Sequence, residues 1–433
     1  MSPSLDVPTQ GHAPRPVQRL GILGSGQLGR FLAQAAQEAG LSVCVLSPEA
    51  ASPAHAVLRA GVDTELLAPY TQPEALAQLA AHSDVVTLEF ENIPLPALQA
   101  LQPLVPVCPS DRVLAVAQDR WLEKSLAKTL GLPVAPVLPV ASGSALAVGL
   151  QKLGVVSGGK AVLKSRRLGY DGKGQRVIAY SDLESQSPHS IWEAFEPCLE
   201  PESGAVLEAW VPWTLELSVG VARQANGKTC VLVPFENHHE NGILSHTVFP
   251  ARVPESLSHQ VVAYTRQLAE ALDLEGLLCV EWFATHTATG WQLAFNEMAP
   301  RPHNSGHLTM NWQTAQGQAV PSQYQRHVEA LLGQEFLPTL GEPLPAVMVN
   351  VLGDHLLTGP IHPPGSDFAA WLHKHYPNAY CHWYDKPEAR VGRKMAHITV
   401  VATHAQQGVE LLLTQAMAIR AGLTAYYQGQ GLP

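Results

Sequence analysis

Cysteine is scarce in this sequence, and the pattern of the six cysteines excludes two common kinds of covalent or metal stabilisation. They are widely scattered and form no C-x-x-C pair, which argues against a disulfide framework and against a zinc site. Cys44 and Cys279 lie inside apolar runs, where buried free thiols are typical of a reducing compartment. We therefore expect free cysteines in a cytoplasmic protein.

Long hydrophobic runs and an excess of basic charge are also missing. No stretch of about 18 apolar residues occurs, so no membrane span is expected. Residues 1–18 lack the apolar centre of a signal peptide, and we expect them to form a disordered tail. The 27 Lys and Arg against 37 Asp and Glu give a net charge of −10, which disfavours binding to nucleic acid. Any anionic ligand must therefore meet local clusters of cations and backbone N–H groups.

The length of 433 residues predicts two or three domains, because one hydrophobic core rarely serves more than about 250–300 residues. The first predicted elements are a strand (19–23), a glycine turn (24–29) and a helix (30–39). Two further strands (41–47 and 84–88) follow. This strand–helix–strand order predicts a parallel sheet.

The middle of the chain predicts a large α+β domain. Its expected helices are 112–130 and 323–332, and its expected strands are 205–209, 215–223, 229–233, 277–284 and 291–297. A Pro- and Gly-rich stretch at 338–345 is the candidate boundary to a small third domain. That domain is expected to begin with a strand at 346–352 and to end in a helix near 407–421.

The glycine turn contains Gly24, Gly26 and Gly29 in a G-x-G-x-x-G pattern between a strand and a helix. Glycines let the backbone approach a phosphate, and the helix N-terminus offers free N–H donors. A dinucleotide site, a monophosphate site and a tight turn without a ligand all fit this pattern. No acidic residue stands at the end of the second strand to hold a ribose, so the motif alone is weak.

A second glycine-rich segment follows an expected strand that ends in Lys164. Three cations and three glycines come within the next ten residues, which favours a flexible loop folded over nucleotide phosphates. The segment is not a P-loop, because G-x-x-x-x-G-K-[ST] is absent. A solvated basic hairpin is the alternative.

Two apolar strands carry one carboxylate each, Glu281 and Glu297, and a turn at 285–290 joins them. The midpoint of the two positions is (281 + 297)/2 = 289, so a hairpin sets the two acids roughly opposite each other. At a separation of about 4 Å they repel by roughly 4 kcal/mol at an effective dielectric near 20. A bridging Mg²⁺ ion would relieve this repulsion, and pairing of one acid with Arg301 or another base is the alternative.

The segment 296–307 is broken by two prolines and is rich in polar side chains. Arg301, His303, Asn304 and Ser305 could together form a set of donors for a small oxyanion. Zinc is conceivable here, but neither H-E-x-x-H nor a Cys/His spacing supports it.

Taken together, these segments resemble ATP-grasp enzymes, and most closely the 5-(carboxyamino)imidazole ribonucleotide synthase family of purine biosynthesis. The resemblance runs from about residue 19 to about residue 400. It is carried by residues 23–30, 87–91, 119–120, 164–175, 208–211, Glu216, 236–244, Glu281, 296–307, 322–327, 382–386 and 392–394. No single segment is specific, but the ordered set is.

The resemblance implies an α/β and α+β protein with ATP-grasp architecture. Its parts would be a Rossmann-like amino-terminal domain at 19–118, an ATP-grasp domain at 119–340 and a small carboxy-terminal domain at 341–433. ATP would bind within the middle domain, together with Mg²⁺ on Glu281 and Glu297. The implied ATP-binding residues are Arg120, Lys164, Gly169, Tyr170, Gly172, Lys173, Gly174, Gln175, Glu208, Ala209, Trp210, Val211, Glu216, His239, Asn296 and Glu297.

The resemblance further implies carboxylation of 5-aminoimidazole ribonucleotide with ATP and bicarbonate, in a homodimer. The implied ribonucleotide-binding residues are Gln27, Glu89, Tyr170, Asp171, Lys386 and Arg393. Arg301, His303, Asn304 and Ser305 would bind bicarbonate or its phosphorylated form. The implied catalytic residues are Asp171, which would orient the amine, with Arg301, His303, Lys386 and Arg393.

Two features depart from the family pattern. Leu168 stands where the family usually has glycine, and the stretch 310–320 is longer than usual and is expected to be an exposed insertion. Without the resemblance, Lys386 and Arg393 would be interpreted as ordinary surface charges. Two other functions stay open: a different ATP-grasp ligase, such as a ribonucleotide formyltransferase, and a nicotinamide-dependent oxidoreductase.

Overall fold

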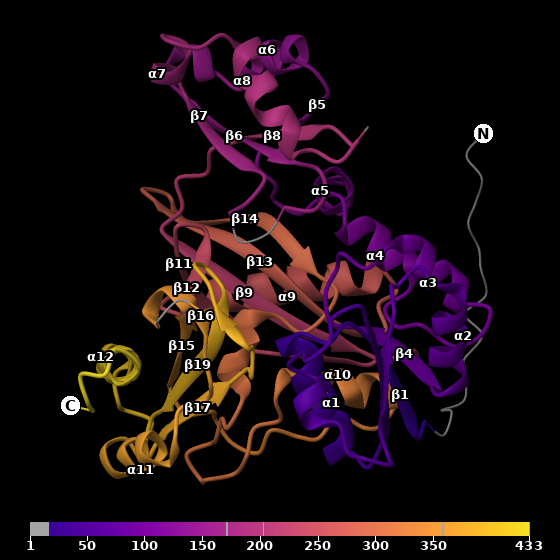
Figure 1. The fold of residues 1–433 in the computed structure, drawn as a ribbon. Helices are drawn as coiled ribbons and strands as arrows, with labels where there is room; N and C mark the ends of the chain where they lie inside the picture. The colour runs from indigo at the N-terminus through magenta and orange to yellow at the C-terminus, as the bar shows by residue number, and fades with distance from the viewer. Residues whose placement is uncertain (1–16, 170–171, 202, 357–358, 433) are drawn as a thin grey trace.

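The structure is a computed structural model that describes residues 17–169, 172–201, 203–356 and 359–432. The described residues form both parallel and antiparallel sheets with helices against them, which confirms the mixed α/β and α+β class (Figure 1). The predicted tail lies mostly outside the described residues. Within the described part of the chain, no helix has the length and apolar character needed to cross a membrane.

The amino-terminal part contains the parallel sheet that the sequence predicted. Its strand order is β3-β2-β1-β4, and β1 pairs in parallel with both β2 and β4. The strands are β1 Arg19–Leu23, β2 Ser42–Ser47, β3 Thr64–Leu67 and β4 Val85–Leu88. The helices are α1 Gln27–Glu38, α2 Pro73–Ala81 and α3 Leu95–Leu101. One apolar cluster joins α1 to one face of the sheet, and another joins α2 and α3 to the opposite face.

A small lobe at the top of Figure 1 contains a four-stranded sheet of order β5-β8-β6-β7. Its strands are β5 Val137–Val140, β6 Lys160–Ser165, β7 Gln175–Ala179 and β8 Ala205–Ala209. Its helices are α6 Gly143–Lys152, α7 Tyr180–Leu183 and α8 Pro188–Phe195. Apolar residues of α6 and α8 pack on the sheet, so the lobe has its own core.

The largest sheet has nine strands in the order β14-β13-β9-β11-β12-β15-β19-β17, with β10 paired to β9. The strands are β9 Leu215–Arg223, β10 Thr229–Val231, β11 Phe235–Glu240, β12 Ile243–Phe249, β13 Gly276–Thr287, β14 Gly290–Ala299, β15 Ala346–Leu352, β17 Ala379–Trp383 and β19 Lys394–Val401. β15 pairs with β12, so the sheet runs without a break into the carboxy-terminal part. β16 Gly359–Pro360 and β18 Glu388–Ala389 form a separate pair.

Helices cover this sheet at both ends. α9 Glu255–Ala271 packs against β9 and β13, while α11 Ser366–His375 and α12 Val409–Tyr427 pack against β15 and β19. α10 Gln323–Leu332 contacts both α1 and β13. It thereby connects the nine-stranded sheet to the parallel sheet, and the two carry the walls of one cleft.

Three local expectations were wrong. The predicted helix 112–130 is two helices, α4 Asp111–Ala117 and α5 Arg120–Thr129, because Asp119 caps α5 through bonds to its first N–H groups. Several strands were not predicted, including β3, β11 and β12. The stretch 310–320 is exposed only near its tip, since Trp312 is buried and its ring N–H donates to the carbonyl of Leu344.

Candidate active site

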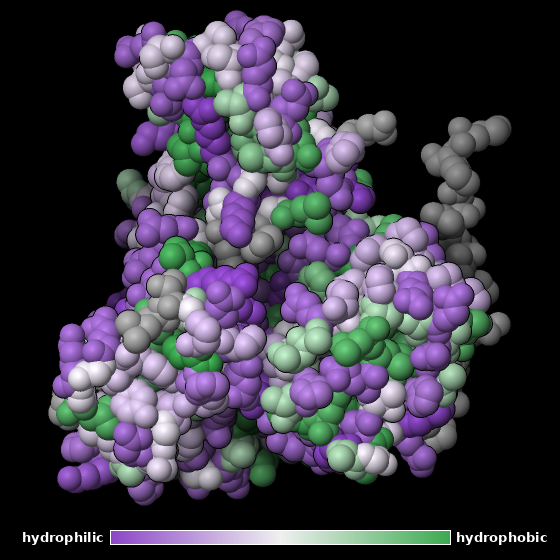
Figure 2. All heavy atoms as spheres, in the orientation of Figure 1, coloured by the Kyte–Doolittle hydropathy of each residue, from purple (hydrophilic) through white to green (hydrophobic). Residues whose placement is uncertain are grey.

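A cleft of about 450 Å³ opens where the three sheets approach one another. Figure 2 shows the front face hollowed between the upper lobe and the two lower parts, with hydrophilic residues around the opening. The lining includes nine of the residues that the sequence singled out: Gln27, Glu89, Arg120, Gly169, Glu281, Glu297, Arg301, His303 and Asn304. Residues separated by up to 277 positions in the chain therefore share one cavity.

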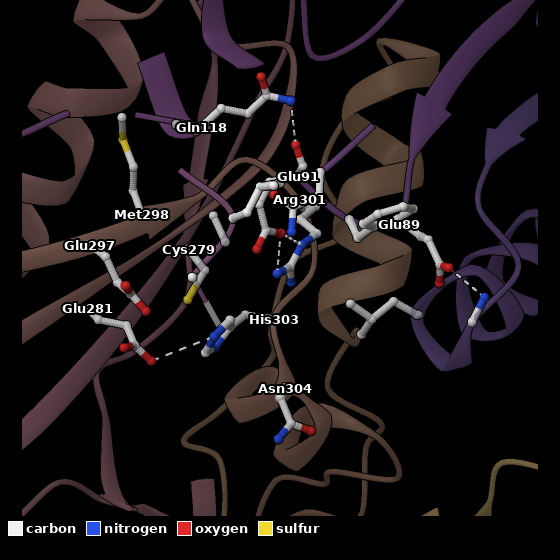
Figure 3. A pocket seen from close by; sticks show the side chains of 18 of the residues that line it. Glu89, Glu91, Gln118, Cys279, Glu281, Glu297, Met298, Arg301, His303 and Asn304 are labelled. Carbon is white, nitrogen blue, oxygen red and sulfur yellow. Dashed lines mark hydrogen bonds and ion pairs between the residues drawn. The ribbon is translucent and has the colours of Figure 1, made fainter. Parts of the chain in front are cut away.

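The opposed carboxylates of the hairpin lie at the centre of this cleft. β13 and β14 are antiparallel, and Glu281 lies opposite Glu297, as predicted, although the pairing follows a register shift between Glu281 and Trp282. Figure 3 shows the two carboxylates side by side. Burial and the charge of Glu297 raise the pKa of Glu281 to about 8, even though His239 opposes the shift. The site therefore holds more negative charge than its surroundings stabilise.

The contacts of the two acids with basic side chains are long. Arg120 Nη2 lies 3.7 Å from Glu297, and Nε2 of the uncharged His303 ring lies 3.6 Å from Glu281. Arg301 pairs with neither acid, because its guanidinium forms an ion pair with Glu91 (Figure 3). The other part of that alternative, pairing with another base, is met by the long Arg120–Glu297 contact. A bound cation remains the fitting partner for the pair.

The two acids fit a metal that takes most of its ligands from a nucleotide. Among the described residues, no group of three or more His, Cys, Asp or Glu side chains is arranged to hold a metal ion. Mg²⁺ commonly binds through one or two carboxylates and completes its shell with waters and phosphate oxygens. Glu281 and Glu297 match that requirement.

A buried charge cluster connects the upper lobe to the hairpin. Glu208 on β8 lies 3.0 Å from Lys164 Nζ and 3.2 Å from Lys124 Nζ. Burial alone would raise the pKa of Glu208, but the two lysines lower it to about 2. Lys124 also donates to the main-chain carbonyl of Asn296, and Lys164 lies 3.5 Å from the Asn296 side-chain oxygen. Lys124, on α5, thus joins β8 to β14.

The residues after Glu208 continue the edge between the upper lobe and the large sheet. Ala209 ends β8, and the Trp210 ring lies 5.7 Å from Lys160 Nζ. Val211 follows in the described loop between β8 and β9. None of these residues lines the cleft itself, and neither does Lys164.

Glu216 and His239 form an ion pair across β9 and β11. Burial would lower the pKa of His239, but the hydrogen bond with Glu216 and the charge of Glu281 raise it to about 9. His239 is therefore positively charged near neutral pH. This cation lies beside the acidic pair without contacting it.

The glycine loop lies between β6 and β7. Gly169 lines the cleft, and its carbonyl accepts a hydrogen bond from Arg120 Nη2 at 2.9 Å. Gly172, Lys173 and Gly174 lead into Gln175, which begins β7 opposite Lys164. Tyr170 and Asp171 lie outside the described residues, so their predicted contacts stay predictions.

The amino-terminal glycine turn binds a carboxylate of the chain itself. Glu89 follows β4 and accepts hydrogen bonds from the backbone N–H groups of Gly26 (2.5 Å) and Gly29 (2.6 Å). A Cβ atom on Gly26 would come within 2.8 Å of this carboxylate, so the turn requires glycine there. Because these donors are already engaged, the turn does not offer the open pyrophosphate site that the dinucleotide alternative needs.

Donors after β14 face the acids from the other side of the cleft. Asn304 is buried, and its amide oxygen and nitrogen have no hydrogen-bond partner among the described residues. His303 Nδ1 lies 2.9 Å from the Ser305 hydroxyl. Burial and the neighbouring Arg301 lower the pKa of His303 well below its ordinary value, so the ring is neutral. This segment can therefore bind an anion by hydrogen bonds beside a permanent guanidinium charge.

Lys386 and Arg393 are not ordinary surface charges. Lys386 is buried, and its ammonium group donates to the Lys394 carbonyl at 2.8 Å. Burial and the charges of Arg393 and Lys394 lower the pKa of Lys386 to about 7. Arg393 donates to the Glu388 carbonyl. Neither residue lines the cleft, but Lys394 does.

Sequence reasoning missed several residues of the site, chiefly Lys124, Glu123 and Glu91. Glu123 is buried on α5 and accepts from the Met298 N–H, and burial raises its pKa to about 8. The apolar environment of Glu123 and Lys124 comes from β14, which is distant in sequence. Glu89 was among the predicted residues, but its bonds to the glycine turn were not predicted, because they depend on the pairing of β4 with β1.

Comparisons with known proteins agree with this geometry. Three family models match in order: a ribonucleotide synthetase preATP-grasp domain at residues 17–118, an ATP-grasp domain at 125–317, and a phosphoribosylaminoimidazole carboxylase C-terminal domain at 346–410. The fold and the cleft therefore define an ATP-grasp enzyme.

Curated relatives identify the family within the ATP-grasp enzymes. N5-carboxyaminoimidazole ribonucleotide synthase of Brucella melitensis is 36% identical over 89% of this chain and 96% of the relative. The Bacillus subtilis enzyme of that name is also 36% identical, over 88% of this chain and 90% of its own. The chain belongs to the N5-carboxyaminoimidazole ribonucleotide synthase family.

Solved structures of the family superimpose over most of the chain. An ADP complex of an N5-carboxyaminoimidazole ribonucleotide synthetase has a TM-score of 0.79 at 35% identity, covering 93% of this chain and 96% of that one. The Aspergillus clavatus enzyme, in complex with ADP and 5-aminoimidazole ribonucleotide, has a TM-score of 0.76 at 27% identity, with coverages of 93% and 98%.

Proposed function

We propose that this chain catalyses the ATP- and bicarbonate-dependent carboxylation of 5-aminoimidazole ribonucleotide to 5-(carboxyamino)imidazole ribonucleotide, with release of ADP and phosphate, in de novo purine biosynthesis. The observation that carries the proposal is the shared cleft. It sets the acid pair Glu281 and Glu297 next to Arg301, His303 and Asn304, with Glu89 on the opposite wall. Membership of the family supports the same reaction.

ATP binds between the upper lobe and the large sheet in this proposal. Arg120, Lys164 and the loop from Gly169 to Gln175 contact the phosphates. Residues 208–211 hold the adenine, Glu216 holds the ribose, and His239 lies near the nucleotide. Asn296 and Glu297 complete the site. The Lys124–Glu208–Lys164 cluster supports it because the cluster fixes β8 against β14.

Glu281 and Glu297 hold Mg²⁺, which screens the charge of the phosphate oxygens when bound. Arg301, His303, Asn304 and Ser305 bind bicarbonate and position one of its oxygens for the γ-phosphate. The γ-phosphoryl group of ATP is transferred to that bicarbonate oxygen. The products of this step are carboxyphosphate and ADP. Such transfers depend on positioning and electrostatics more than on covalent catalysis. The donors at residues 301–305, which face the acid pair, supply the positioning and the electrostatic stabilisation.

The ribonucleotide is held by Gln27, Glu89, Tyr170, Asp171, Lys386 and Arg393 in this proposal. Its exocyclic amine attacks the carbon of carboxyphosphate or of CO₂ released from it. Phosphate leaves, and the amine proton passes to a general base or to the leaving phosphate. Asp171 orients the amine, an assignment that rests on the sequence. The low pKa of Lys386 supports a site that receives an anion, because a bound phosphate stabilises its charged form.

Further proposals follow from the family. We infer a homodimer in the cytoplasm, with the ranges 19–118, 119–340 and 341–433 as its three domains. The decisive experiment measures ADP release with ATP, Mg²⁺, bicarbonate and 5-aminoimidazole ribonucleotide, leaving out each in turn. Release must require all four. Release that depends on glycinamide ribonucleotide or on an amino acid would instead identify another ATP-grasp ligase.

A further inference from the structure

A buried serine on strand β9 contacts the segment after β14 through its hydroxyl. Ser218 is fully buried and pairs in register with Glu281 on the neighbouring strand β13. Residues opposite each other in an antiparallel pair share one face of the sheet. The Ser218 hydroxyl donates a hydrogen bond of 2.8 Å to the hydroxyl of Ser305.

Ser305 also forms hydrogen bonds with His303. The Ser305 hydroxyl lies 2.9 Å from His303 Nδ1, and the Ser305 backbone N–H donates to the same nitrogen at 3.4 Å. A backbone N–H is always a donor, so Nδ1 is the acceptor. A neutral imidazole with an accepting Nδ1 has its proton on Nε2. The Ser305 hydroxyl, which accepts from Ser218, has its own hydrogen free for Nδ1.

The protonated nitrogen, Nε2, faces Glu281 in the cleft. His303 Nε2 lies 3.6 Å from Glu281 Oε1, and His303 lines the cleft (Figure 3). An Nε2–H group can donate to a carboxylate or to a bound oxyanion. In the other tautomer, Nε2 would direct a lone pair at an ionised Glu281 carboxylate or at a bound oxyanion, which is repulsive.

We propose that Ser218 is a positioning residue that acts through Ser305 to hold His303 as the Nε2–H tautomer, so that His303 offers a donor to bicarbonate. The assignment rests on the proposed function for the identity of the anion. The relay is Ser218, Ser305, His303 and then Glu281 or the anion. Ser218 lies on β9, whereas Ser305 and His303 belong to the segment after β14, so a strand residue sets the hydrogen-bonding character of a loop side chain.

Cys279 is the other group beside Ser305. Its side chain is buried and forms a hydrogen bond with Ser305. A thiol is a weaker hydrogen-bond partner than a hydroxyl, so Ser218 remains the stronger donor to Ser305.

Steady-state kinetics of Ser218→Ala tests the relay. We expect the KM for bicarbonate to rise between about three- and tenfold, the effect of one lost hydrogen bond. The KM for ATP should stay within about twofold, since neither Ser218 nor Ser305 has a hydrogen bond to a proposed ATP-binding residue among those that the structure describes. Ser218→Thr keeps the hydroxyl and should restore the KM for bicarbonate. Ser83→Ala, a buried serine bonded to the Leu79 carbonyl, is the matched control and should change neither constant.

A double-mutant cycle and a spectroscopic measurement separate positioning from mere packing. In a Ser305→Ala background, Ser218→Ala should have no further effect on the KM for bicarbonate, because its route is already broken. Nitrogen NMR of histidine-labelled protein without ligands should show His303 as the Nε2–H tautomer, with the signal assigned by its loss in His303→Gln. In Ser218→Ala the two tautomers should mix.

Additive effects of the two serine variants, or an Nδ1–H tautomer in the wild type, would overturn the assignment. If Ser218→Ala fails to fold, the NMR spectra of the wild type and of Ser305→Ala test the assignment. It requires the Nε2–H tautomer of His303 in the wild type and a mixture of tautomers in Ser305→Ala. Failure of the proposed function looks different. ADP release would then not depend on bicarbonate, while the tautomer in the unliganded protein would still report on Ser218.

Discussion

Replacing Glu281 with glutamine should stabilise the protein while removing its activity. Burial and the charge of Glu297 raise the pKa of Glu281 from 4.5 to about 8. At about pH 7.5 an unfolded glutamate is ionised, whereas the folded one is mostly protonated, which corresponds to an upper limit of about 4 kcal/mol. Water that enters the cleft reduces this figure, so we expect a gain of about 1–3 kcal/mol in the free energy of unfolding.

The sign of the pH dependence follows from the direction of the shift. A carboxyl with a raised pKa in the folded state favours folding fully below 4.5, and this contribution is lost as the pH rises toward about 8. Glutamine does not titrate. The advantage of Glu281→Gln should therefore be small near pH 4.5 and grow up to about pH 8.

Thermal unfolding without nucleotide, at about pH 5 and pH 8, measures this difference. Glu255→Gln is the control, because that side chain is 87% exposed on α9. The rate of ADP release should fall by at least about a hundredfold in Glu281→Gln, the scale of losing one electrostatic contact in a transition state. An unchanged or lower melting temperature at about pH 8 would show that the acid pair is already neutralised within the protein.

Three further predictions concern neighbouring parts of the site. Lys124→Met should lower the free energy of unfolding by about 3–5 kcal/mol in urea titrations, because it leaves Glu208 short of a buried partner; a loss below about 1 kcal/mol would contradict this. Affinity for 5-aminoimidazole ribonucleotide, measured by calorimetry, should decrease from about pH 6 to pH 8.5 as Lys386 loses its charge, and Lys386→Arg should flatten that dependence. Leu168 has a φ of 62°, a backbone conformation that a β-branched residue adopts poorly and glycine adopts easily. Leu168→Val should therefore lower the free energy of unfolding by about 1–2 kcal/mol, and Leu168→Gly by less than about 1 kcal/mol. Equal losses for the two variants in urea titrations would show that the backbone at Leu168 is not strained.

The sequence predicted the parts of the site that depend on local pattern. The approximate opposition of the two acids followed from two apolar strands and one turn. Their direct pairing also needs a register shift between Glu281 and Trp282, because the register up to Trp282 and Phe295 would set Glu281 opposite Asn296. The strand β1, the glycine turn and the helix α1 followed from a short apolar run and the glycine spacing after it. Both features need only short stretches of chain, so they are visible without the fold.

Features that depend on distant contacts were not visible. Lys124 is one charge on a short amphipathic helix, and only the packing of α5 on β14 buries it against Asn296. The break between α4 and α5 depends on Asp119, which also binds Arg166 from the upper lobe. The role of Glu89 in the glycine turn depends on the pairing of β4 with β1. Each case needs the tertiary arrangement before the charge can be placed.

The most direct test of the account is the position of the metal. Crystals grown with ADP and Mn²⁺, a substitute for Mg²⁺ with strong anomalous scattering, should show one peak between the carboxylates of Glu281 and Glu297. That peak should disappear in the Glu281→Gln and Glu297→Gln double variant. A metal bound elsewhere in the cleft, with both carboxylates free of it, would contradict the account.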